Sequence, residues 1–246
     1  MNELDTLVKT YETKDFLKDD PIRFPHRYKD IKDIEIAGFL ASAFAYGNRK
    51  IFTNKLEELF SLMENKPLDY VTNSDYENLK GFNYRFAKDF DIIEVLKILK
   101  NLYLKNGGLG KLFEYGWSQN HEIYPMFQVV TDYFYSRVSN SVGQGFYHLI
   151  PNPKNNGTMK RMNMLLRWFV RDGEVDLGIW KFIPKSELLI PMDVHVARVS
   201  REMGLLTRKS NDMKAVLELT SNLKKLDKND PIKYDFSMFG KGIDKD

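Results

Sequence analysis

Two residues far apart in the chain, Lys160 and Asp193, have the types and settings that nucleophilic chemistry needs. Lys160 begins a segment with helical periodicity near Arg161 and Arg167, and neighbouring cations help a lysine amine to lose its proton and become a nucleophile. Asp193 precedes another helical segment, whose free backbone N–H groups and dipole stabilise a charged carboxylate. Each also has an ordinary explanation, because most lysines are solvated and an Asp before a helix is most often only its cap.

Three tracts of sequence share a pattern with a known superfamily. They are the turn-rich and basic stretch 151–171, the run Ile190-Pro191-Met192-Asp193-Val194-His195, and the run Leu40-Ala41-Ser42-Ala43-Phe44. Together they resemble the helix-hairpin-helix DNA glycosylases, which include endonuclease III and the 8-oxoguanine glycosylases. The most specific element is Asp-Val-His, since that superfamily has Asp-x-His at the start of the helix that carries its essential aspartate. A wider string from Lys160 to Asp235 also resembles a bacterial family of unassigned function.

The resemblance implies a DNA repair enzyme of the base excision type, an N-glycosylase with abasic-site lyase activity. Lys160 matches the lysine whose amine attacks the sugar carbon bearing the base, forming a Schiff base that permits strand scission by β-elimination. Asp193 matches the essential aspartate. The two residues are 33 positions apart, a separation closer to that of archaeal 8-oxoguanine glycosylases than of endonuclease III. The resemblance therefore favours an oxidised purine such as 8-oxoguanine, in double-stranded DNA, as the substrate.

Residues that bind the damaged base are also implied by the resemblance. Phe44 aligns roughly with the position from which endonuclease III inserts a side chain into the duplex, although its place on an apolar face favours core packing. Asp235 and Phe239 are four residues apart and so share a helix face. They resemble the polar and aromatic pair with which 8-oxoguanine glycosylases read and stack the base. The alternative is that Asp235 is a surface carboxylate and Phe239 a core residue.

DNA-backbone contacts are expected around a turn-rich hairpin that precedes the Lys160 helix. The stretch from Lys154 to Arg171 carries five cations and no acid, which makes a basic patch available to phosphates. The residues expected to contact DNA are Lys154, Gly157, Arg161, Arg167 and His195. The compact Gly-x-Gly turn of the family is replaced here by Asn-Pro-Lys-Asn-Asn-Gly, so an ordinary loop is an equal alternative. For His195, a partly buried core histidine is the commoner outcome.

Helical periodicity dominates the chain and strict alternation is scarce, so the sequence predicts an all-α fold. We expect Asp33 to cap a helix that ends near Gly47, and Asp193 to cap a helix running to Gly204. A basic helix from Met159 is expected to bury one face and expose its cations on the other. Four more helices are predicted. One has an inward face made of Ile51, Leu56, Leu59, Phe60 and Met63, two span 91–103 and 124–138, and the last begins at Asp230-Pro231.

The expected organisation is two helical subdomains. By resemblance, residues 33–184 form a central bundle that ends in a helix-hairpin-helix element, and residues 1–32 with 185–246 form a second subdomain from both chain ends. A cleft between the subdomains is expected to hold Lys160 and Asp193. The DNA is expected to lie across the cationic face of the Lys160 helix.

Composition limits the alternatives. The 246 residues include 37 Lys and Arg against 34 Asp and Glu, and no Cys, so disulfides and Cys-ligated metals are excluded. Four His residues show no metal-ligand spacing, and no metal or organic cofactor is expected. The N-terminus does not read as a secretory signal and the longest small-apolar run is too short to span a membrane, which indicates a cytoplasmic protein with no membrane role. We expect a monomer, and the sequence identifies no protein partner. A DNA-binding module that has lost the chemistry is the main alternative, and an enzyme acting on RNA is the least favoured.

Overall fold

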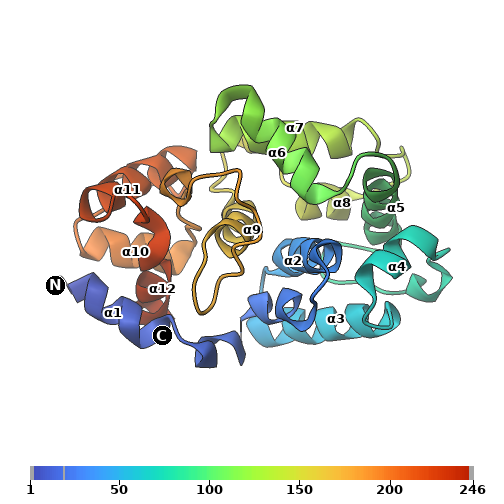
Figure 1. The fold of residues 1–246 in the computed structure, drawn as a ribbon, viewed down its shortest axis with the longest axis horizontal. Helices are drawn as coiled ribbons and strands as arrows, with labels where there is room; N and C mark the ends of the chain where they lie inside the picture. The colour runs from blue at the N-terminus through green and yellow to red at the C-terminus, as the bar shows by residue number, and fades with distance from the viewer. Residues whose placement is uncertain (1–2, 19, 244–246) are drawn as a thin grey trace. The chain divides into compact units, whose positions relative to one another are not determined.

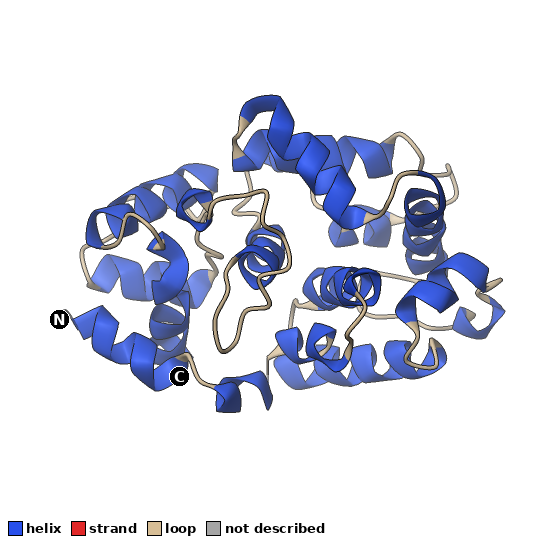
Figure 2. Ribbon diagram, viewed as in Figure 1, coloured by secondary structure: helices blue, strands red, loops and turns tan. Residues whose placement is uncertain are grey.

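The computed structural model describes residues 3–18 and 20–243. All regular secondary structure in these residues is helical, and Figure 2 draws helices and loops only. Within the same residues, β-type pairing is confined to two isolated bridges, one joining Tyr84 to Ala87 and the other Asp172 to Leu177. The all-α fold predicted from the sequence is therefore confirmed.

The chain divides into two compact units, whose helices are labelled in Figure 1. We call Phe24–Pro153 the internal unit, and Met1–Arg23 together with Lys154–Asp246 the terminal unit. The division expected from the sequence has the central bundle extending to residue 184. In the structure, residues 154–184 belong instead to the unit that holds both chain ends.

The internal unit is built around one central helix. Its α-helices are α2 (Ile31–Phe44), α3 (Arg49–Leu62), α4 (Pro67–Asn73), α5 (Asp89–Lys105), α6 (Leu109–Asn120), α7 (Ile123–Tyr135) and α8 (Gln144–Leu149), with short 3₁₀ turns at Pro25–Arg27 and Glu77–Leu79. Every residue of α2 from Ile34 to Phe44 is buried, as expected for a helix that is apolar on all sides. The cap of α2 is Asp30, which accepts from the N–H groups of Lys32 and Asp33. The prediction that Asp33 caps this helix is wrong, since its carboxylate accepts from the Leu68 N–H instead.

Two helix boundaries of the internal unit follow from local sequence. The side chain of Asn48 caps α3, and four of the five predicted inward-facing residues of this helix region are buried, while Ile51 is exposed. The end of α5 falls at the predicted Asn-Gly-Gly stop. Gly108 there has a φ of +103°, and a Cβ at that position would lie 2.6 Å from the Tyr103 ring. Glycine is therefore required at Gly108 by both backbone conformation and space.

The terminal unit brings the two chain ends together. Its α-helices are α1 (Glu3–Tyr11), α9 (Lys160–Val170), α10 (Val194–Glu202), α11 (Met213–Leu226) and α12 (Asp235–Ile243), with 3₁₀ turns at Lys14–Lys18, Pro21–Arg23, Lys185–Glu187 and Pro231–Tyr234, and one at Pro153–Asn155 where the two units join along the chain. The last helical segment begins at Pro231, as predicted, but its first turn is 3₁₀. Helix α12 packs against both α1 and α10. A Cβ at Gly240 would lie 2.5 Å from the Tyr11 ring, so this glycine permits the close approach of α1.

Helix α9 is buried on more than its apolar face. Met162, Leu165, Leu166 and Phe169 are buried as predicted, but Arg167 and Arg171 on the other side are buried too. The prediction that all five cations of this stretch are exposed to phosphates is therefore wrong for these two arginines. The following segment folds back over the end of the helix, where the Trp180 N–H donates to the Phe169 carbonyl at 2.6 Å.

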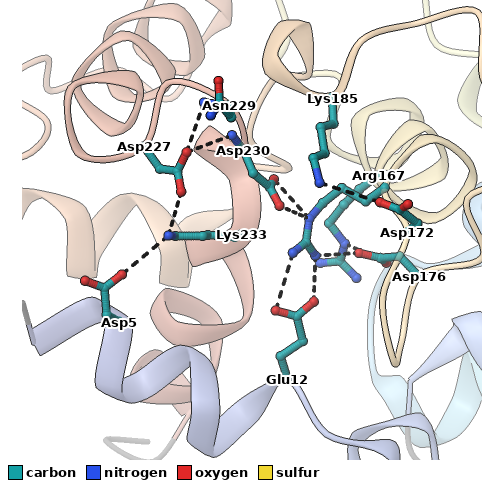
Figure 3. A network of polar contacts seen from close by, with 11 residues as sticks. Asp5, Glu12, Arg167, Asp172, Asp176, Lys185, Asp227, Asn229, Asp230 and Lys233 are labelled. Carbon is teal, nitrogen blue, oxygen red and sulfur yellow. Dashed lines mark hydrogen bonds and ion pairs between the residues drawn. The ribbon is translucent and has the colours of Figure 1, made fainter. Parts of the chain in front are cut away.

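A network of carboxylates explains how two arginines are buried (Figure 3). Arg171 pairs with Glu12 at 2.8 Å, Asp176 at 2.7 Å and Asp230 at 3.0 Å. Arg167 pairs with Asp176 at 3.3 Å and with Asp235. Burial lowers the pKa of the Arg171 guanidinium, but these carboxylates outweigh burial and raise it overall. Because two of its partners, Glu12 and Asp230, come from opposite ends of the chain, Arg171 joins α9 to both chain ends and accounts for the place of residues 154–184 in the terminal unit.

Candidate functional site

The carboxylate of Asp193 uses its two oxygen atoms differently. Oδ1 accepts hydrogen bonds from the backbone N–H groups of His195 at 3.0 Å and Val196 at 2.9 Å. These bonds make Asp193 the N-cap of α10, as the sequence predicts. Oδ2 faces Lys160, whose Nζ lies 3.1 Å away. The capping role and an interaction with Lys160 are therefore compatible in one side chain.

Lys160 is the first residue of α9, and Met159 before it has a left-handed φ of 51°. The lysine side chain is 30% exposed and that of Asp193 is 16% exposed, so the pair is open to solvent in part. The Lys160 Nζ also lies 5.7 Å from the centre of the half-buried Phe239 ring of α12. Three helices of the terminal unit thus bring an amine, a carboxylate and an aromatic ring together.

The charge closest to Lys160 is negative, not positive. The sequence expectation is that Arg161 and Arg167 activate the lysine by repulsion. In the structure Arg167 is neutralised by Asp176 and Asp235, and the ion pair of Lys160 is with Asp193. Asp193 is also the group placed to accept the proton that the amine must lose before it attacks.

Asp235 lies buried next to this pair, as the first residue of α12. Its Oδ2 accepts from Arg167, whose guanidinium also covers the Phe236 ring at 3.9 Å. Burial raises the pKa of Asp235 to about 6, with a further rise from Asp193, against lowering by Arg167 and Lys160. Asp235 is therefore mostly ionised at neutral pH, and the charges of both Lys160 and Asp193 affect its pKa.

Asp235→Asn is expected to change how the free energy of unfolding depends on pH. The folded-state pKa of about 6 is above the usual 3.8, so between these values the folded state binds more protons than the unfolded state. The contribution of Asp235 to stability therefore increases as pH falls from 7 to 5, by about 1 kcal/mol. Urea unfolding of the wild type and the variant at pH 5, 6 and 7 measures this, because groups common to both cancel in the difference. A difference that is constant with pH would contradict the assignment.

The remaining predicted DNA contacts lie in the same unit but not all on its surface. Lys154 and Gly157 are exposed in the loop before α9, whereas Arg161 and His195 are half-buried. The His195 ring lies 6.4 Å from the Phe239 ring, edge to face, which places it beside the Lys160 and Asp193 pair. Arg167 is the exception, because its guanidinium is buried among carboxylates.

Phe44, the residue expected to enter the duplex, is fully buried in the internal unit. Its ring packs 5.8 Å from that of Tyr84. A neighbouring turn, in which Tyr84 and Ala87 exchange two backbone hydrogen bonds of 2.9 Å, presents Arg85 and Phe86 instead. Phe86 is 54% exposed, and Arg85 has a left-handed φ of 52°. The sequence signal for this surface is the aromatic and basic run Tyr-Arg-Phe, which has no helical period.

Two kinds of site are not found in the described part of the chain. No three His, Asp or Glu side chains converge there in a way that could hold a metal ion. Among the same residues, no helix combines the length and the apolar character needed to span a bilayer.

Comparison with known proteins places the chain in a family. The family model described as a protein of unknown function, DUF2400, matches residues 20–244. Neither the curated proteins nor the solved structures yielded a match. The matched range includes Lys160, Asp193, Asp235 and Phe239, so the whole candidate site lies within it. The chain belongs to the DUF2400 family.

Proposed function

We propose that this protein is a DNA N-glycosylase with abasic-site lyase activity. The observation that carries the proposal is the 3.1 Å separation of the Lys160 Nζ and an Asp193 carboxylate oxygen, both of them partly exposed. A nucleophilic amine beside a proton acceptor is the arrangement that covalent catalysis by lysine requires. The resemblance of the Asp-Val-His run to the glycosylase superfamily supports the same assignment.

In the proposed reaction, Asp193 takes a proton from the Lys160 ammonium group. The free amine attacks the sugar carbon that bears the base, and the base leaves with the bonding electron pair and takes up the proton held by Asp193. Asp193 is then ionised again, and two backbone N–H groups of α10 hold its negative charge facing the positive charge of the nitrogen bound to the sugar. The bond from this carbon to the ring oxygen breaks as the ring oxygen takes a proton from the lysine nitrogen, which gives a Schiff base between Lys160 and the opened sugar. β-Elimination then removes the C2′ proton and expels the 3′ phosphate with its bonding electron pair, which breaks the strand.

Base recognition is proposed for Asp235 and Phe239. Among the described residues, Asp235 Oδ2 accepts from Arg167, whereas Oδ1 has no hydrogen-bond donor. An ionised carboxylate oxygen accepts an N–H from the edge of a base, and oxidation of guanine at C8 converts N7 from an acceptor into an N–H donor. The half-buried Phe239 ring offers a face for stacking. These features favour an oxidised purine such as 8-oxoguanine.

We further propose that the protein acts as a monomer on double-stranded DNA in the cytoplasm.

Borohydride trapping tests the proposed function directly. The wild type is incubated with a duplex that contains 8-oxoguanine, and borohydride reduces the Schiff base to a stable amine that moves as a covalent complex in a denaturing gel. Lys160→Ala is expected to abolish this complex. Lys181→Ala is the matched control, because Lys181 is an exposed lysine of the same unit, and it is expected to trap like the wild type. A complex that survives Lys160→Ala would remove the mechanism.

The second candidate function is a DNA-binding protein without catalysis. It is favoured by the ion pair itself, because a lysine paired with the N-cap of α10 also has the plain structural role of joining α9 to α10. On this alternative, duplex DNA binds with an affinity that falls as salt rises. Asp193→Asn then leaves binding unchanged, and no base is released from any lesion in a panel of oxidised, deaminated and alkylated duplexes.

A further inference from the structure

Two exposed loops of the terminal unit carry cations that the proposed chemistry at Lys160 does not use. One loop precedes α9 and the other connects α10 to α11. They are joined by a backbone hydrogen bond of 3.2 Å, in which the Met213 N–H donates to the Asn156 carbonyl. We use the name two-loop surface for a set of exposed polar residues from these loops and the first turn of α11; they are Lys154, Asn155, Asn156, Lys209, Ser210, Asn211 and Lys214.

The second of these loops is held in place by arginine side chains. Arg201 of α10 donates to the carbonyls of Arg208 and Lys209, each at 2.9 Å, and to the Asn211 side chain at 2.7 Å. These acceptors are neutral, so the charge of Arg201 adds to that of the surface. The acid of the loop, Asp212, caps α11 and is paired with Arg208 at 2.7 Å. The loop is therefore preorganised, and its one carboxylate is neutralised.

The composition of the two-loop surface indicates its partner. Among the described residues, Lys209 and Lys214 form no ion pair, and both are exposed. Lysine, asparagine and serine side chains are the groups that contact DNA phosphates. The chemistry thus fits a polyanion with regularly spaced phosphates.

We propose that the two-loop surface binds the phosphate backbone of a nucleic-acid duplex. The loop that contains Lys154 leads directly into Lys160, so a duplex held here continues towards the Lys160 and Asp193 pair of the same unit. The inference deepens the proposed function and rests on it for the identity of the duplex as DNA. It assigns a backbone-binding role to the α10–α11 loop, in particular to Lys209 and Lys214.

Salt-dependent binding of an undamaged, fluorescein-labelled DNA duplex tests the proposal by anisotropy. The test variant replaces Lys154, Lys209 and Lys214 by Gln, and the control replaces three exposed lysines of the internal unit, Lys66, Lys97 and Lys105, by Gln. Each lost phosphate contact lowers the slope of log K against log salt by about 0.9. We expect the slope of the test variant to be smaller by about 2 to 3, and its affinity at 0.1 M salt to be about 10²-fold weaker or more. The control is expected to keep the wild-type slope.

Three results would overturn the proposal. The first is an unchanged slope in the test variant, and the second is an equal loss of slope in the control. The third is binding of the wild type to phosphatidylserine vesicles that the test variant loses while its DNA slope is unchanged. If the wild type forms no borohydride-trapped complex with a lesion duplex, the proposed function fails, whereas the slope comparison still decides whether the two-loop surface binds a duplex.

Discussion

Asp193→Asn is expected to lower the rate of base release by about 10²–10³-fold while the protein stays folded. Asparagine caps a helix about as well as aspartate, so the two hydrogen bonds to the N–H groups of His195 and Val196 are expected to remain. What the variant loses is the negative charge 3.1 Å from the Lys160 amine. An amide neither accepts the lysine proton nor stabilises positive charge on the sugar.

Single-turnover base release from an 8-oxoguanine duplex, with enzyme in excess, measures this effect. Asp30→Asn is the matched control, since Asp30 caps α2 in the same way but is part of the internal unit. Its rate is expected to equal that of the wild type. Both variants are expected to unfold within about 0.5 kcal/mol of the wild type. Base release by Asp193→Asn at the wild-type rate would show that Asp193 is only a helix cap.

Arg171→Leu is expected to destabilise the protein by about 3–5 kcal/mol. The guanidinium of Arg171 is buried with three carboxylates, Glu12, Asp176 and Asp230. Leucine leaves these acids close together, poorly hydrated and without the cation that compensates them. Since they come from both chain ends and from the segment after α9, the loss is expected to loosen the terminal unit as a whole. Urea unfolding at pH 7 provides the measurement.

Arg27→Leu is the matched control for this prediction. Arg27 also makes a bidentate ion pair, in which its two terminal nitrogens lie 2.8 and 2.6 Å from the Glu57 carboxylate oxygens. The side chains of Arg27 and Glu57, however, are 34% and 40% exposed. An ion pair in contact with water contributes about 1 kcal/mol or less. Equal costs for the two variants would refute the buried network as a source of stability.

Features that depend on a few neighbouring residues could be read from the sequence. Asp193 caps α10 because the groups it bonds are two and three positions ahead of it. The end of α5 at Asn106 follows from the glycines after it, which adopt conformations that other residues avoid. The all-α fold follows in the same way from apolar residues repeated at the helical period.

Features that depend on distant partners could not be read in this way. The period of α9 correctly indicates its apolar face, but it also suggests that Arg167 and Arg171 are solvated. Their burial depends on acids elsewhere in the chain, and Glu12 is 159 positions from Arg171. A similar limit applies to Phe44 and Phe86, because periodicity cannot tell which aromatic residue of a unit is left exposed once its core is filled.

The candidate site combines both kinds of information. The sequence by itself determined that Lys160 and Asp193 each begin a helical segment, because helix starts are set by local hydrogen bonding. It did not determine that the amine and the carboxylate meet, or that Asp235 is buried beside them with a raised pKa. Those facts were decided by the packing of α9, α10 and α12 in the terminal unit, since a contact between residues 33 positions apart depends on how whole helices bury their surfaces against one another.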